Sequence, residues 1–169
     1  ILQSETGTSL LSVIDRTKTA MGGRLLRKWL KQPLLDCAEI YRRQEHLAWL
    51  KEKKEERESL SELLSSIKDL ERLSSRAKAN LISAYELRAF GKSLELIPDI
   101  KRILQNDTVR FGKLLAELPE CRKIAALIET SISDELPIRY NEQVGIIRSG
   151  FSEELDKLRQ ALKNGKNFL

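Results

Sequence analysis

The chain contains few of the side chains on which catalytic and metal sites are usually built. Its 169 residues include a single histidine, His46, and two cysteines, Cys37 and Cys121, that lie far apart. Their spacing fits no zinc pattern, and two isolated cysteines are typical of a protein in a reducing cytosol. Aromatic residues make up only 5% of the chain. The composition therefore argues against a metal centre, a disulfide framework and a row of aromatic platforms for single-stranded nucleic acid.

Long apolar segments are also missing. No run approaches the ~18 apolar residues of a membrane-spanning helix, and the first residues lack the pattern of a signal peptide. We therefore expect a cytoplasmic chain without membrane contact. Neither Ile1 nor Leu169 resembles a natural chain end, so we also expect a fragment excised from a longer polypeptide.

The sequence does contain helical periodicity along almost its whole length. Charged residues make up 33% of the chain, and long unbranched side chains lose little freedom in a helix. Apolar residues recur at spacings of three and four, as in amphipathic helices. The predicted fold is all-α, with a multi-helix core over residues 1–151 and a protruding long helix over residues 152–169. The helical pattern fails between Asp134 and Gly150, where residues 144–147 are a candidate short strand.

The helix that precedes Pro33 has two different faces. Met21, Leu25 and Trp29 fall on its apolar half, and we expect Trp29 to be a buried core residue. The opposite half is basic and carries Arg24, Arg27, Lys28 and Lys31. These four residues are candidate weak phosphate contacts, because each cation near DNA adds to a salt-dependent affinity. The alternatives are a solvated face, or pairing with carboxylates of a neighbouring domain.

Two patterns mark helix starts. Asp36 is followed three residues later by Glu39, and Ser83 by Glu86. Side chains of these types at this spacing satisfy the first N–H groups of a helix, so we expect a cap at each place.

The last segment carries a narrower apolar stripe. Its leucines recur mainly at spacings of three and four, interrupted by Gly165, and are Leu155, Leu158, Leu162 and Leu169. Such a stripe is typical of a helix that pairs with one other long helix. We expect it to be a helix-pairing seam whose natural partner is missing from this chain.

One tripeptide imitates a nucleotide-binding loop. Gly91-Lys92-Ser93 ends like a phosphate-binding loop, but Glu86 stands where that pattern needs a glycine, and the surrounding periodicity is helical. We interpret Gly91 as a small residue at a helix crossing. We expect His46 to lie at the surface, because no metal ligand or nucleophile accompanies it. The sequence thus predicts no enzyme.

Three segments share an order and a spacing with one protein family. The first covers residues 9–15, 17–22, 24–30 and 33–34; the second covers residues 67–73 with Arg76; the third covers Asp134, Pro137 and residues 144–151 and 154–159. Together they resemble the core, or lever, domain (domain III) of MutS-type DNA mismatch repair proteins. Many relatives have glycines at the positions of Asn80 and Val144. Asparagine tolerates a left-handed backbone, so we expect the turn at Asn80 to be retained.

The resemblance implies a structural domain that couples an ATPase to a DNA clamp. In the family, two long helices extend from this domain as levers, and residues 152–169 resemble the start of the outgoing one. The resemblance implies no catalytic, cofactor-binding or metal-binding residue in this chain. The parent protein would be a DNA-dependent ATPase and a dimer. It would bind ATP with Mg²⁺ and mismatched double-stranded DNA, contact this segment through its other domains, and associate with the nucleoid when on DNA.

Two other classes of function stay open from the residues alone. The net charge of +5 and the cations from Arg16 to Lys31 suit a basic helical nucleic-acid-binding module. The leucine stripe suits a helical protein-interaction adaptor.

Overall fold

The fold is all-α, as the sequence predicts. The computed structural model describes residues 9–136 and 145–166, and within them every element longer than a single β-bridge is a helix. In chain order the helices are α1 (Leu10–Ile14), α2 (Ala20–Lys31), α3 (Cys37–Glu52), α4 (Lys54–Ser66), α5 (Leu70–Lys78), α6 (Ala84–Glu95), α7 (Ile97–Leu104), the short 3-10 helix η1 (Gln105–Asp107), α8 (Thr108–Glu117), α9 (Arg122–Ser131) and α10 (Glu153–Lys166).

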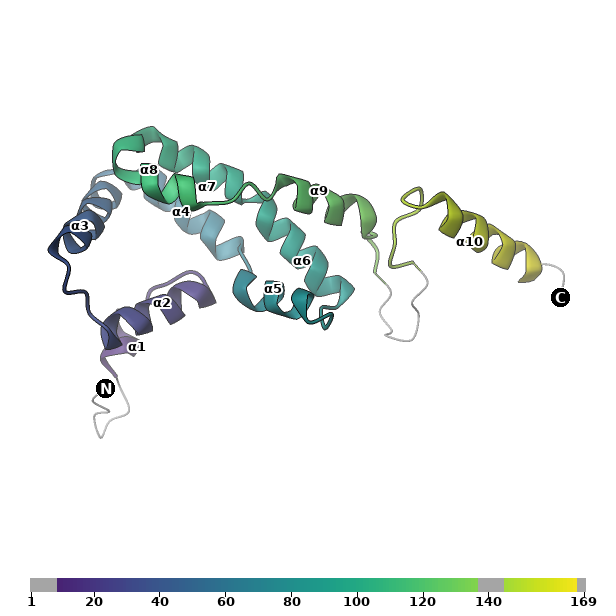
Figure 1. Ribbon diagram of the computed structural model, residues 1–169, viewed down its shortest axis with the longest axis horizontal. Helices are drawn as coiled ribbons and strands as arrows, with labels where there is room; N and C mark the ends of the chain where they lie inside the picture. Colours follow the sequence, from purple (N-terminus) through teal and green to yellow (C-terminus); the bar gives the residue numbers. More distant parts are fainter. Residues whose placement is uncertain (1–8, 137–144, 167–169) are drawn as a thin grey trace.

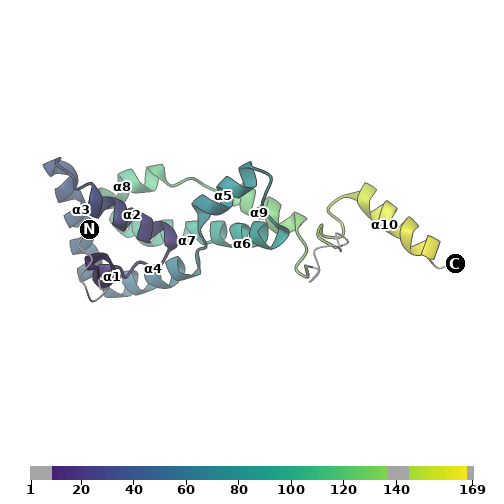
Figure 2. The ribbon, with the colours of Figure 1, turned by 90° about the horizontal axis from the view of Figure 1, so that it is seen from below.

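The helices are arranged along an elongated molecule. At one end α3, α4, α7 and α8 pack on one another, while α5, α6 and α9 form the middle (Figure 1). Helix α10 projects beyond α9 at the far end, and the view turned by 90° shows the same separation (Figure 2). Within the described ranges, no helix is long and apolar enough to cross a membrane.

Two small clusters of buried side chains stabilise this arrangement. One lies at the α3–α8 end and consists of Trp49, Leu60, Leu104 and Phe111. The rings of Trp49 and Phe111 meet edge to face, with their centroids 4.9 Å apart. The other cluster lies in the middle and consists of Leu94, Ile97 and Ala125. Because α7 begins in the second cluster and ends in the first, it connects the two.

Helices α6 and α9 approach each other closely at Gly91. A β-carbon at this glycine would lie 2.8 Å from the Cγ2 atom of Ile128 on α9, closer than side-chain packing allows. Two residues later, Ser93 is almost fully buried; its hydroxyl accepts a hydrogen bond from the Lys68 amide at 3.0 Å and donates one to the Ala89 carbonyl at 2.8 Å. The interpretation of Gly91 as a small residue at a helix crossing is confirmed.

The corner between α5 and α6 contains both the predicted turn at Asn80 and the predicted helix cap at Ser83. Asn80 has a φ of 56°, the left-handed conformation expected there. Ser83 and Glu86 form a complete capping box, and the Arg76 guanidinium pairs with the Glu86 carboxylate at 3.0 Å. Asp36 also caps its helix, α3. Its side chain accepts a hydrogen bond from the amide of Ala38, two residues later, whereas Ser83 accepts one from Glu86, three residues later.

Two expectations about single side chains are wrong. Trp29 is 40% exposed, because α2 lies at the edge of the molecule and buries none of its residues in this chain. One face of its ring is covered by the Arg43 guanidinium, which lies 3.8 Å from the ring centroid. His46 is half-buried rather than at the surface. Its ring stacks on Phe111 at 4.7 Å, and its Nε2 lies 2.9 Å from the Arg110 carbonyl oxygen.

The candidate strand is replaced by a single bridge. Ile147 pairs with Ile132 in one antiparallel β-bridge, and Gly145 to Ile147 form no strand. Val144, where the predicted strand begins, lies outside the described residues.

The tight crossing at Gly91 leads to a test with a matched control. Gly91→Ala should destabilise the chain by ~1–3 kcal/mol, because its methyl group has to displace Ile128. Gly112→Ala on α8, where no atom lies within 4 Å of a new β-carbon, should stabilise it by ~0.5–1 kcal/mol through helix propensity. Urea denaturation measures both. Equal stability of the two variants would show that the helices separate at Gly91 in solution.

Candidate functional site

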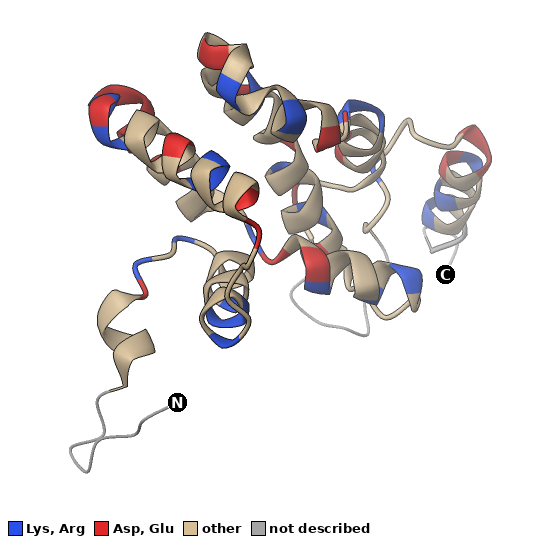
Figure 3. Cartoon of the chain, turned by 60° about the vertical axis from the view of Figure 1, so that its left-hand side comes forward, with Lys and Arg blue, Asp and Glu red and all other residues tan. Residues whose placement is uncertain are grey.

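The first candidate site is the basic face of α2. The helix starts at Thr19, whose hydroxyl accepts a hydrogen bond from the Gly22 amide at 2.9 Å. Its cations gather on one side of the helix (Figure 3). They line a shallow depression together with the end of the helix, and the lining residues are Arg24, Arg27, Lys28, Lys31 and Gln32. The structure thus brings the four predicted cations together.

Arg24 differs from the other three cations, because it joins α2 to the start of α5. Its two terminal nitrogens each lie 2.7 Å from one oxygen of Asp69, and its Nε donates to Glu71 at 3.2 Å. Such a two-pronged pair fixes geometry as well as charge. The Arg24 hydrogen bonds, helped by the Arg72 amide, lower the pKa of Asp69 to about 2. Arg24 is therefore engaged in holding α2 on the body.

The remaining cations of this face are free to meet a partner. Arg27, Lys28 and Lys31 are exposed, and none of them forms an ion pair with a residue in the described ranges. On the adjoining side of α2, Leu30 and Arg27 line a groove of about 330 Å³ with Leu10 and Leu11 of α1. Arg27 and Lys31 line this groove as well as the depression, so the surface around α1 and α2 combines basic and apolar side chains.

The second candidate site is the leucine stripe of α10. The helix begins after Ser152, whose hydroxyl accepts a hydrogen bond from the Leu155 amide at 3.3 Å. Leu155 is half-buried, whereas Leu158 and Leu162 are 59% and 69% exposed. Leu169, the last residue of the predicted seam, lies outside the described residues. Within the described part of α10, the stripe faces solvent for most of its length.

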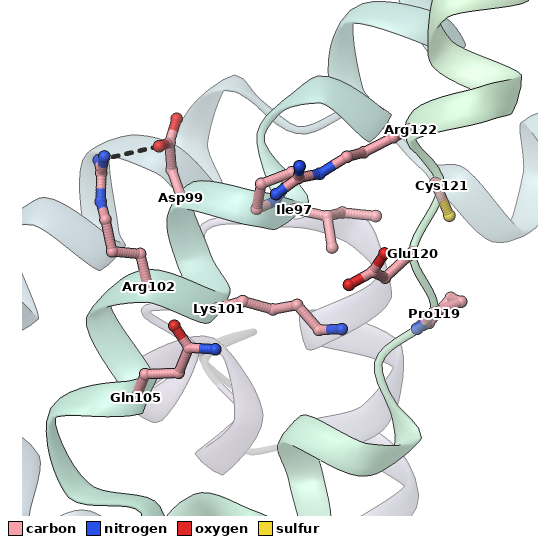
Figure 4. A pocket seen from close by; sticks show the side chains of 10 residues that line it. Ile97, Asp99, Lys101, Arg102, Gln105, Pro119, Glu120, Cys121 and Arg122 are labelled. Atoms are coloured by element: carbon pink, nitrogen blue, oxygen red, sulfur yellow. Dashed lines mark ion pairs between the residues drawn. The ribbon is translucent and has the colours of Figure 1, made fainter.

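A cavity of about 400 Å³ lies between α7 and the segment that leads to α9. Figure 4 shows side chains of both charges around it, including Lys101, Glu120 and Arg122. Asp99 on its rim is paired with Arg102 at 2.8 Å. Within the described ranges, no group of three histidine, cysteine or acidic side chains is arranged to hold a metal ion.

The tripeptide Gly91-Lys92-Ser93 does not form a phosphate-binding loop. All three residues lie inside α6, and Gly91 and Ser93 are buried. A phosphate loop presents successive backbone N–H groups to its ligand, whereas the N–H groups in the middle of a helix are already bonded within the helix.

Sequence reasoning missed a group of ion pairs around Asp134. This carboxylate pairs with Arg88 of α6 at 3.0 Å and with Arg148 at 2.8 Å. Arg148 and the other cations near it lower the pKa of Asp134. Asp134 and Arg148 both stand in the third segment of the family resemblance, which was the available signal. Nothing in the helical periodicity pointed to Arg88 as their partner.

These features define an all-helical module with a basic face on α2 and an exposed leucine stripe on α10. The family model for MutS domain III matches residues 1–165. A DNA mismatch repair protein MutS from Caldicellulosiruptor bescii is 39% identical over 170 residues, covering 100% of this chain and 20% of that protein. Those from Alkaliphilus oremlandii and Natronomonas pharaonis are 42% and 34% identical, covering 95% and 96% of this chain and 18% and 19% of their own lengths.

The chain belongs to the MutS domain III family. It spans about a fifth of the length of these curated relatives. The resemblance drawn from the three sequence segments is thereby confirmed.

The Arg24–Asp69 pair predicts how stability depends on pH. The folded-state pKa of Asp69 is about 2, below its usual ~3.9 in an unfolded chain. The pair therefore stabilises the fold above pH ~4 and loses its effect as the pH falls towards 2. The stability difference between the original chain and Arg24→Gln should be largest near neutral pH and should shrink in acid, as measured by urea denaturation across pH.

Lys28→Gln on the same helix is the control. It removes a cation that has no ion pair in the described ranges, so it should leave the Asp69 pKa unchanged in an NMR titration, while Arg24→Gln should raise it. An Asp69 pKa that does not move in Arg24→Gln would contradict the structural role given to Arg24.

Proposed function

We propose that this chain is a non-catalytic lever domain of a mismatch repair protein. The observation that carries the proposal is the position of α10, which projects from the helical body with Leu158 and Leu162 exposed along one side. The 14 residues of α10 extend about 21 Å. A helix of this kind moves as a rigid rod, so a small rotation at its base becomes a larger displacement at its tip.

The parent protein supplies the two sites that the lever connects. The relatives are named DNA mismatch repair proteins, and we propose that the parent of this chain binds mismatched double-stranded DNA, binds ATP with Mg²⁺ and hydrolyses it, and acts as a dimer in the cytoplasm. Coupling two such sites needs an element with more than one arrangement whose equilibrium both ligands bias. The stripe of α10 would pair with a second long helix of the parent, and the body would contact the other domains.

We also propose a minor role for the basic face. Arg27, Lys28 and Lys31 would make weak phosphate contacts that add to DNA affinity without reading its sequence. Arg24 is left out of this group, because its guanidinium is held by Asp69 and Glu71.

The coupling role is testable in the full-length parent. Leu158→Ala combined with Leu162→Ala should leave ATP binding and DNA binding nearly unchanged, because the proposed role of both leucines is to pair with another helix of the parent. The stimulation of ATP turnover by mismatched DNA should fall by ~5-fold or more, the size of a typical coupling energy. Steady-state turnover with and without mismatched duplex measures it.

Lys157→Ala combined with Gln160→Ala is the matched control, because both residues are exposed on the same helix outside the leucine stripe. This pair should leave the stimulation intact. A leucine variant that keeps the full stimulation would show that α10 does not transmit the signal.

The basic face is testable on the chain itself. Replacing Arg27, Lys28 and Lys31 together by Gln should reduce the dependence of duplex affinity on salt, by ~0.9 in the log–log slope for each lost phosphate contact. Replacing Lys51, Lys53 and Lys54 is the control, because these exposed lysines lie among carboxylates near the α3–α4 junction. An identical slope in the original chain and the α2 variant, measured by fluorescence anisotropy, would exclude the phosphate contacts.

A further inference from the structure

The residues that follow α9 form backbone hydrogen bonds with the residues that precede α10. The Ser133 amide donates to the Ile146 carbonyl, and the Arg148 amide donates to the Ser131 carbonyl, both at 2.8 Å. Together with the bridge between Ile132 and Ile147, these bonds bring the end of α9 beside the segment that leads to α10. We call the paired residues 131–134 and 145–148 the neck.

The carboxylate of Asp134 connects the neck to the helical body. One of its oxygens accepts a hydrogen bond from Arg88 of α6 at 3.0 Å, and the other accepts one from Arg148 across the neck at 2.8 Å. Arg88 also donates to the backbone carbonyls of Ser133 and Asp134. A single carboxylate thus joins α6 to both chain segments of the neck.

The other side of the neck is fixed to α10 itself. Arg159, in the second turn of α10, donates to the Ile147 carbonyl at 2.9 Å and pairs with Asp156 at 3.2 Å. Asp156 in turn accepts a hydrogen bond from the Gly150 amide at 2.6 Å. Gly150 has a φ of 86°, which favours glycine at this bend. The start of α10 and the neck are therefore bonded as one unit.

These contacts form a continuous connection from α6 to α10. We infer that Asp134 and Arg148 are positioning residues that set the direction of α10 relative to the helical body. The inference rests on the proposed lever function, because only in a lever does the direction of this helix matter.

The ion pairs of Asp134 are weak enough for the direction of α10 to change. The Asp134 side chain is 64% exposed and that of Arg148 is 38% exposed, and exposed ion pairs contribute little to overall stability. Ile132, in contrast, is buried at the base of the neck. Loss of the Asp134 pairs should therefore loosen the direction of α10 without unfolding the body, since the backbone bonds of the neck and those from Arg88 to the Ser133 and Asp134 carbonyls remain.

The test measures the direction of α10 in the chain alone. Spin labels are attached to cysteines introduced at Glu129 on α9 and Gln160 on α10, after the native Cys37 and Cys121 have been replaced by Ala. The labelled chain is diluted with unlabelled chain, so that only distances within one molecule are recorded. We expect a broadened or shifted distance distribution in Asp134→Ala and also in Arg148→Gln, which breaks the same pair from the other side.

The controls separate direction from folding. Asp134→Glu retains the carboxylate and should keep the distribution near the original. Asp99→Ala removes an exposed pair with Arg102 on α7 and should leave the distribution unchanged. Unfolding midpoints close to that of the original chain should accompany the broadening. An unchanged distribution in both Asp134→Ala and Arg148→Gln would overturn the inference.

This experiment can fail independently of the proposed function. It uses neither ATP nor DNA, so an unchanged distance excludes the role of Asp134 and leaves the coupling experiment on Leu158 and Leu162 unaffected. Conversely, if the leucine variant of the parent keeps its full stimulation by mismatched DNA, the lever function is excluded, even if the spin-label distances change.

Discussion

The close contact between α6 and α9 at Gly91 is the constraint on which the rest of the structure depends. Because this residue has no β-carbon, Ile128 can pack directly on the backbone of α6. The same helix then connects the remaining parts of the body. The buried Ser93 bonds to the segment between α4 and α5, Glu86 pairs with Arg76 of α5, and Arg88 reaches the neck.

The outer helices are attached in a different way. Helix α2 is joined to the body by the Arg24 pair and by the contact of Trp29 with Arg43, and the base of α10 is joined through Asp134 and Arg148. These polar contacts are directional but partly exposed, so they orient a helix more than they stabilise it. A packed centre with outer helices that are oriented by polar contacts supports the proposed lever function.

Much of this fold follows from local sequence signals, but the burial of particular side chains does not. Helical periodicity predicts the fold class, and the cap at Ser83 and the turn at Asn80 depend on neighbouring residues alone. Trp29 lies on the apolar half of its helix, yet periodicity cannot show whether another helix covers that half. Asp69, which pairs with Arg24, and Arg88, which pairs with Asp134, lie 45 and 46 residues away from their partners in the sequence, and no local rule connects them.

The central claim is that α6 and α9 form a rigid centre, and that α10 is attached to it only through the base of α10. Amide hydrogen exchange tests this claim most directly. The amides of α6 should exchange only on global unfolding, because the crossing with α9 and the bonds of Ser93 open only then. The amides of residues 158–164 in α10 should exchange much faster, because Leu158 and Leu162 are 59% and 69% exposed. Equal protection of α6 and of residues 158–164 in a chain shown to be monomeric would contradict the account, because the leucine stripe would then be packed on the body.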